Sequence, residues 1–294
     1  YSYNSPSVKT DFDLVFKNTL LASPAAILSL QMDEESWNGA TGEVLDLSGN
    51  NLNGTAVNGP VTDDTAPAII GNPGTCRYGE FDGSNQYINI PDHPLLDLTG
   101  SFTVAVWIKI DALPRGGGLK SILSKDENYE FHVNSSGKIF WWWQSLPGNT
   151  TRSFTSTGTI TPGQWTHVAI RFEPNAQTIF INGAASGTAT FLGTPLINSD
   201  PLQIGADQNS GGRYFNGDID EVRIFGVALG DAQIAALAGE THFCKVKLTG
   251  CAVSFPDGIN SHDNGDINFG FRAQLFSSPD SILEADNVSR NGGA

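Results

Sequence analysis

The chain has 294 residues, enough to bury one large hydrophobic core, and a single all-β sandwich often reaches this size. Sixteen basic against 31 acidic residues give a formal net charge of −15, which repels nucleic-acid phosphates, so we expect no nucleic-acid partner. No run of about eighteen apolar residues occurs, which predicts no membrane insertion.

Three regions follow one another along the chain. Residues 1–25 contain a short alternating stretch around Phe12–Phe16, from which we expect an N-terminal strand and a linker. Residues 26–243 carry a long series of short β-forming runs between Gly, Asn and Asp turns, which indicates one domain. Residues 244–294 alternate again and are expected to begin a further β-rich region, truncated at Ala294 before a core is complete.

The central region predicts an antiparallel β-sandwich of the jelly-roll type with little helix. The Asn182-Gly183 pair is the strongest hairpin signal, because both residues tolerate positive φ. One short helix is expected from about Asp231 to Ala238, with Ile234 and Leu237 facing inward. The expected strands cover residues 27–32, a pair around the Asp-Gly turn within 79–90, 102–110, 121–125, 129–133, 139–144, 165–172, 178–181, 202–205 and 217–225.

From about residue 26 to 240, the order of several short motifs resembles the laminin-G-like, concanavalin A-like lectin jelly-roll family. The motifs are Met32-Asp33-Glu34, the turn 46–50 closing on Asn53-Gly54-Thr55, Phe81-Asp82-Gly83, the strand 102–108, the stretch 163–168, Ile181-Asn182-Gly183 and the stretch 217–224. The resemblance implies an all-β binding or adhesion domain that acts outside the cell.

A narrower similarity links the chain to MshQ-type proteins, which are encoded with mannose-sensitive haemagglutinin pili. It rests on the stretches 72–76 and 125–132, the run Trp141-Trp142-Trp143 and the exit 240–244. It implies a surface or pilus-associated bacterial protein, exported to the outer surface. The implied partner is a glycan or a surface or pilus protein.

The three cysteines show neither a CxxC pair nor zinc-like spacing, which favours a structural disulfide with one cysteine left over. Cys76 lies in a Gly/Pro loop and Cys244 follows the expected helix, so a Cys76–Cys244 bond would clip the end of the domain to that loop. Cys251 is the rival partner for Cys244.

Two expected strands end in carboxylates, Asp33 and Asp220. In the resembled fold these strands lie side by side, and that edge often holds a structural calcium ion. Oxygen ligands suit Ca²⁺, and the Gly/Asn-rich turn with Ser48, Gly49 and Asn53 could supply more of them. The residue types fit a second interpretation equally well, in which Asp33 caps a turn and Asp220 pairs with Arg223 or meets solvent. The resemblance favours calcium.

The run Trp141-Trp142-Trp143 lies on an expected strand, so Trp141 and Trp143 share one face and Trp142 occupies the other. One face is expected to be core. Together with Glu130, His132 and Arg152, Trp142 could form a platform on which a sugar ring stacks. Alternatively, all three tryptophans cover the sandwich core.

Enzyme signatures are missing from the sequence. Glycanases of the resembled superfold carry Glu-x-Asp-x-x-Glu on one strand, and no such run occurs here. Asp218 and Asp220 alternate correctly, but the third acidic residue is absent. We therefore expect a lectin-like binding module and no enzyme. A protein-binding scaffold in pilus assembly and a polysaccharide-degrading enzyme are the alternatives.

Overall fold

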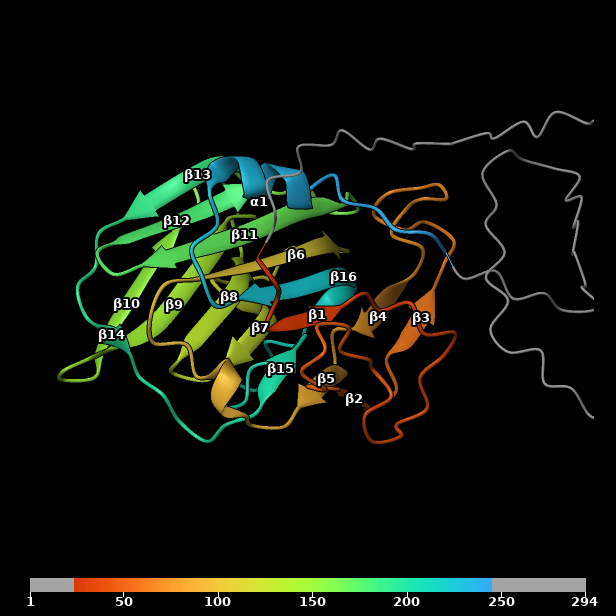
Figure 1. Ribbon diagram of the computed structural model, residues 1–294, viewed down its shortest axis with the longest axis horizontal. Coiled ribbons are helices and arrows are strands. Elements are labelled where there is room, and N and C mark those ends of the chain that lie inside the picture. Colours follow the sequence, from red (N-terminus) through yellow and green to blue (C-terminus); the bar gives the residue numbers. More distant parts are fainter. Residues whose placement is uncertain (1–23, 245–294) are drawn as a thin grey trace, which may run out of the picture.

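The computed structural model describes residues 24–244 and shows two β-sheets packed face to face (Figure 1). Each sheet has eight strands, and every strand pair is antiparallel. The predicted β-sandwich is therefore confirmed. The strand expected around Phe12–Phe16 and the β-rich region expected after Cys244 lie outside the described residues.

The first sheet is built around β6 and β16, two long neighbouring strands at its centre. The spatial order is β13 (Ala184–Ala189), β12 (Ala176–Ile181), β11 (Thr166–Glu173), β6 (Phe102–Ile110), β16 (Asn216–Phe225), β4 (Tyr78–Asp82) and β3 (Val61–Asp63), with β1 (Leu28–Leu30) also paired to β16.

The second sheet carries the outer face that matters most for function. Its order is β10 (Thr150–Thr155), β9 (Ile139–Leu146), β8 (Tyr129–Asn134), β7 (Leu119–Lys125), β15 (Leu202–Ile204), β5 (Tyr87–Ile90) and β2 (Thr55–Val57), with β14 (Thr194–Pro195) also paired to β9.

The main hydrophobic core fills the space between the two sheets, as strand alternation predicts. From β6, Val104, Val106 and Ile108 point into it and are fully buried. From β9, Trp141 and Trp143 enter it and are also fully buried. The predicted alternation of the two faces is therefore confirmed for β6 and β9, and the structure shows that Trp141 and Trp143 are on the core face.

Two connections test the expected turns. Between β12 and β13, Asn182 and Gly183 have φ values of 49° and 75°. A two-residue type I′ hairpin turn requires positive φ at both of these positions. The Asp82-Gly83 stretch was expected to join two strands that pair with each other, and this prediction is wrong. β4 belongs to the first sheet and β5 to the second, so the chain crosses between the sheets there.

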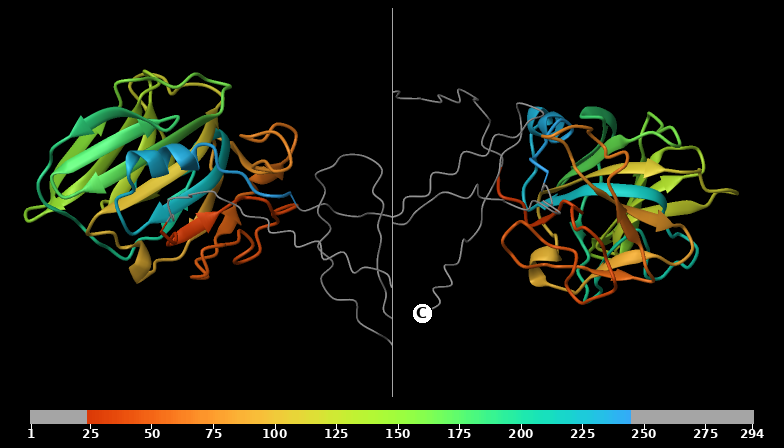
Figure 2. Two further views of the ribbon diagram at one scale, coloured as in Figure 1. Left: turned by 45° about the horizontal axis from the view of Figure 1, so that its top comes forward. Right: turned by 90° about the vertical axis from the view of Figure 1, so that its right-hand side faces the viewer.

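A smaller apolar cluster lies on the outer face of the first sheet, under the helix α1 (Asp231–Leu237). Ile234 and Leu237 of α1 are buried there, as predicted, against Ala105 and Phe180 of the sheet. Figure 2 shows α1 lying across the strands of this sheet. A short 3-10 helix, η1 (Pro94–Leu96), follows β5. Within residues 24–244, no helix has the length and apolar character needed to cross a membrane.

Candidate functional site

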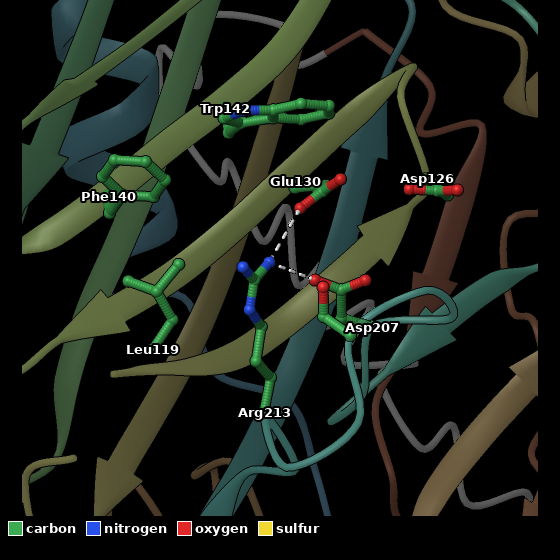
Figure 3. Close-up of a pocket in the computed structure, with 8 residues that line it drawn as sticks. Leu119, Asp126, Glu130, Phe140, Trp142, Asp207 and Arg213 are labelled. Carbon is green, nitrogen blue, oxygen red and sulfur yellow. Dashed lines mark hydrogen bonds and ion pairs between the residues drawn. The ribbon is translucent and has the colours of Figure 1, made fainter. Parts of the chain in front are cut away.

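A cavity of about 290 Å³ opens on the outer face of the second sheet (Figure 3). Its floor is formed by side chains of β7, β8 and β9, and one wall by the loop between β15 and β16. The lining residues are Leu119, Asp126, Glu130, Phe140, Trp142, Asp207, Ser210 and Arg213. The cavity thus combines aromatic rings with charged groups, as sugar-binding sites do.

The aromatic part of the cavity comes from β9. Because Trp141 and Trp143 point into the core, strand alternation places Phe140 and Trp142 on the outer face. Both side chains are half-buried, so part of each remains exposed in the cavity. The structure therefore separates the tryptophan run into two core residues and one lining residue.

Glu130 and His132 occupy the same outer face on β8, opposite Trp142 and Phe140 respectively. The Glu130 carboxylate lies 2.8 Å from His132 Nε2. Burial lowers the pKa of His132 to about 3, so its ring is neutral at pH 7. Burial also raises the pKa of Glu130, and the nearby Asp207 carboxylate adds to the rise. This pair favours a shared proton over an ion pair at neutral pH.

The polar wall contains Asp207 and Arg213, which were not predicted as site residues from the sequence. Arg213 Nη1 lies 2.7 Å from an Asp207 carboxylate oxygen and 3.8 Å from Glu130. The loop that carries them is fixed to β7, because Ser121 donates its backbone N–H to the Arg213 carbonyl and its hydroxyl to the Ala206 carbonyl. Because β7 and this loop are far apart in the sequence, no local sequence pattern predicts that they are in contact.

Arg152, which we expected beside Trp142, lies elsewhere. It pairs across β10 and β9 with Trp143, a core-facing residue, so its side chain lies on the same face as Trp143 and points away from the face that carries Trp142. There its Nε donates to Ser145 Oγ at 3.2 Å, and its guanidinium lies over Phe191. Arg213 supplies the positive charge of the cavity that we had expected from Arg152.

A second group of functional interest lies at the edge of the first sheet. β1 and β4 both pair with the same edge of β16, β1 from residue 222 onward and β4 up to residue 219. The interval between them holds Asp220 and Glu221, and the pairing of β16 with β6 shifts register there. Asp33 follows β1 directly, so the structure brings Asp33 and Asp220 to one place, as predicted.

Asp220 is fully buried, and neither of its carboxylate oxygens forms a hydrogen bond of normal geometry with residues 24–244. Burial raises the pKa of Asp220 well above its usual value, and the neighbouring Glu221 and Asp33 contribute to the rise. Burial likewise raises the pKa of Asp33 to about 6, although His242 opposes this. The buried Asp220 carboxylate and the half-buried Asp33 carboxylate, which accepts one backbone N–H from Arg77, fit a divalent cation whose positive charge would balance theirs.

The surroundings of Asp33 favour an oxygen-binding metal such as Ca²⁺ over zinc. Cys76 lies beside Asp33 and His242, but its sulfur is bonded to Cys244, so it cannot act as a thiolate ligand. His242 Nε2 is engaged by Glu221 at 2.7 Å. Carboxylates therefore remain the principal ligands available here.

Backbone strain is concentrated at the same place. Met32, Cys76 and Glu221 have φ values of 57°, 63° and 51°, a region that residues other than glycine seldom adopt. Such conformations cost about 1 to 3 kcal/mol each and are often found at binding sites.

The expected disulfide between Cys76 and Cys244 is present. It links positions 168 residues apart, and Gly74 and His242 exchange two backbone hydrogen bonds beside it. The bond therefore fastens the end of the domain to the loop next to Asp33.

The Gly/Asn-rich turn is closed by its own hydrogen bonds. Asp46 accepts hydrogen bonds from the Ser48 hydroxyl and the Leu52 backbone, and Asn53 Oδ1 accepts from the Asp46 backbone. Gly49 lies at the exposed tip with a φ of 90°. Ser48 and Asn53 are thus bound to Asp46, so we do not include this turn among the ligands of the cation site at Asp33 and Asp220.

Two antiparallel sheets packed face to face, with one short helix on an outer face, define the class of concanavalin A-like β-sandwich domains. The chain belongs to the concanavalin A-like lectin/glucanases superfamily, whose family model matches residues 82–235. No curated protein matches the chain. The similarity to pilus biogenesis proteins has no support from these comparisons and stays a prediction.

Solved structures show the same fold at low sequence identity. The binding domain of Paraclostridial Mosquitocidal Protein 1 is 17% identical with a TM-score of 0.56, over 73% of this chain and 52% of that one. The botulinum neurotoxin serotype G binding domain is also 17% identical, with a TM-score of 0.54 over 73% and 50%. The chain thus spans about half the length of these two toxin domains.

A third structure is matched along its whole length. It is domain 4 of AbnA, a GH43 extracellular arabinanase from Geobacillus stearothermophilus, solved in complex with arabinotriose. It is 23% identical with a TM-score of 0.52, over 70% of this chain and 100% of that domain.

Proposed function

We propose that the chain is a non-catalytic, carbohydrate-binding module that holds a glycan in the cavity beside Trp142. The half-exposed Trp142 ring, set next to Glu130, Asp207 and Arg213, carries this proposal. A sugar ring offers an apolar face for stacking on the indole and hydroxyl groups for the charged side chains. The arabinotriose bound to the AbnA domain supports the choice of a carbohydrate as ligand.

We place this module outside the cell, in an adhesion role at a bacterial surface. The Cys76–Cys244 disulfide supports export, because disulfides persist in oxidising compartments. A pilus-associated setting follows only from the resemblance of the sequence to MshQ-type proteins. A scaffolding role without sugar binding is the alternative, and the glycan-binding experiment below separates the two.

Replacing Trp142 with alanine should weaken the binding of any glycan identified on an array by at least about tenfold, which is about 1.4 kcal/mol. The melting temperature should change little, because this ring covers the outer face and is not part of the core. Isothermal titration of the native and variant proteins measures both affinities.

Trp165→Ala is the matched control, because Trp165 is also half-buried but precedes β11 in the first sheet. Its affinity should equal that of the native protein. An array without hits, or equal loss of affinity in both variants, would remove the proposal of a glycan site at Trp142.

We also propose a structural Ca²⁺ ion at Asp33 and Asp220. Adding Ca²⁺ to metal-stripped protein at pH 8 should raise the free energy of unfolding by about 2.7 kcal/mol at 100 times the dissociation constant. Asp220→Asn should abolish this gain, whereas Asp111→Asn, an exposed control, should keep it. A native protein that binds Ca²⁺ without stabilisation, or gives no heat of binding, would contradict the site.

Without Ca²⁺, stability should fall as the pH rises. The folded state holds the protons of Asp33 and Asp220 more tightly than the unfolded state, because both pKa values are raised from 3.8. The melting temperature of stripped protein should therefore decrease from pH 4 upward and through pH 6, where Asp33 loses its proton. Asp220→Asn should flatten this decrease, and an unchanged slope in that variant would argue against the buried charge as its cause.

A further inference from the structure

The charges around the cavity at Trp142 are unbalanced. Among the lining residues, Asp126, Glu130 and Asp207 are acidic and Arg213 alone is basic. Arg213 is engaged by Asp207 at 2.7 Å and faces Glu130 at 3.8 Å. His132 adds no positive charge at neutral pH, because burial lowers its pKa to about 3. The cavity therefore has more acidic than basic groups.

Because Arg213 is engaged by Asp207 and faces Glu130, Asp126 is the acidic lining residue without a positively charged partner among residues 24–244. Its side chain accepts a hydrogen bond from Asn209 Nδ2, and it has no ion-pair partner in the described part of the chain. Burial, together with the surrounding acidic groups Glu130, Asp207, Glu127 and Asp200, raises the pKa of Asp126 to about 7. A positively charged group in the cavity would be attracted to this position and would stabilise the ionised carboxylate.

The aromatic rings add to the attraction for a cation. The faces of Trp142 and Phe140 carry negative electrostatic potential, and a cation over such a face gains about 0.5 to 2 kcal/mol. Figure 3 shows the carboxylates of Asp126, Glu130 and Asp207 on one side of the cavity and Phe140 with Leu119 on the other. A ligand with an apolar ring face and a positively charged substituent matches both sides.

We propose that the cavity selects glycans that carry a free amino group, with the sugar ring on Trp142 and the ammonium group facing Asp126. This inference rests on the proposed glycan-binding function and names the class of glycan. N-acetylation removes the positive charge and adds bulk, so acetylated sugars bind more weakly. Acidic sugars meet the carboxylates and are rejected.

The test compares oligosaccharides that differ in one substituent. Isothermal titration at pH 7 measures the binding of a glucosamine tetramer, an N-acetylglucosamine tetramer and cellotetraose to the native protein. The glucosamine tetramer should bind at least about tenfold more tightly than the other two. Raising the salt concentration should weaken its binding selectively, because the preference is electrostatic.

Asp126→Asn should reduce the preference to less than about threefold and leave the affinity for cellotetraose unchanged. Asp111→Asn, at an exposed position that does not line the cavity, should keep the full preference. A melting curve of each variant checks that it is folded.

Three results would overturn the inference. Equal binding of all three tetramers leaves the proposed function standing and removes the amine selectivity. Binding of none of them, with array hits confined to other sugars, also removes it, while an array without any hit removes the proposed function as well. Ethanolamine that binds as tightly as glucosamine would show that the cavity recognises an amine without a sugar ring.

Discussion

Replacing Lys125 with alanine is expected to lower the free energy of unfolding by about 3 kcal/mol, or about 6 to 12 °C in melting temperature. Lys125 Nζ is fully buried and lies 2.7 Å from Asp92, 3.0 Å from Asp97 and 2.9 Å from the Asp200 carbonyl. Its removal leaves two carboxylates and a carbonyl without their shared donor. Both carboxylates are partly exposed, so the loss should stay below that of a wholly buried pair.

Two further variants show whether the charge itself is responsible. Lys125→Met keeps the apolar stem of the side chain. Its free energy of unfolding should still fall by at least half as much as that of the alanine variant. Lys138→Ala removes a half-exposed lysine and should change the free energy of unfolding by less than about 0.5 kcal/mol. Urea denaturation of the three variants provides the comparison. A methionine variant as stable as the native protein would show that the ammonium network contributes nothing to stability.

Replacing both Cys76 and Cys244 with serine should cost about 3 to 5 kcal/mol. The bond closes a very long loop, since the two residues are 168 positions apart. Its loss therefore increases the conformational entropy of the unfolded chain. Urea denaturation under oxidising conditions measures this loss. The Ca²⁺ response should also weaken, because the loop at Cys76 lies beside Asp33.

Cys251→Ser keeps the Cys76–Cys244 bond and is the control, so its stability should equal that of the native protein. Mass spectrometry of a non-reduced digest should recover Cys76 joined to Cys244. A peptide joining Cys244 to Cys251, or a double serine variant within about 1 kcal/mol of the native protein, would contradict the structural role of this bond.

Features set by local periodicity could be predicted from the sequence. The alternation along β6 and β9 predicted which residues share a face, and so placed Trp141 and Trp143 on one side and Trp142 on the other, because side chains of a strand must point to opposite sides. The same alternation placed Glu130, His132 and Trp142 on one outer face once β8 and β9 were taken as neighbours. The helix at 231–237 and the Asn182-Gly183 turn depended on equally local chemistry.

Features set by register and by long connections could not be predicted. Arg152 pairs with Trp143, and a shift of the β9–β10 register by one residue would have turned its side chain to the outer face. Asp207 and Arg213 reach the cavity through a loop whose contacts with β7 span more than eighty residues. The irregular pairing of β16 at Asp220 likewise depends on both of its neighbouring strands.

The central claim is that the cavity at Trp142 holds a glycan, and a crystal structure of the protein soaked with the tightest hit of a glycan array tests it most directly. We expect a sugar ring stacked on Trp142, with polar contacts to Glu130, Asp207 or Arg213. A glycan bound at another surface, with the cavity free of sugar, would contradict the claim.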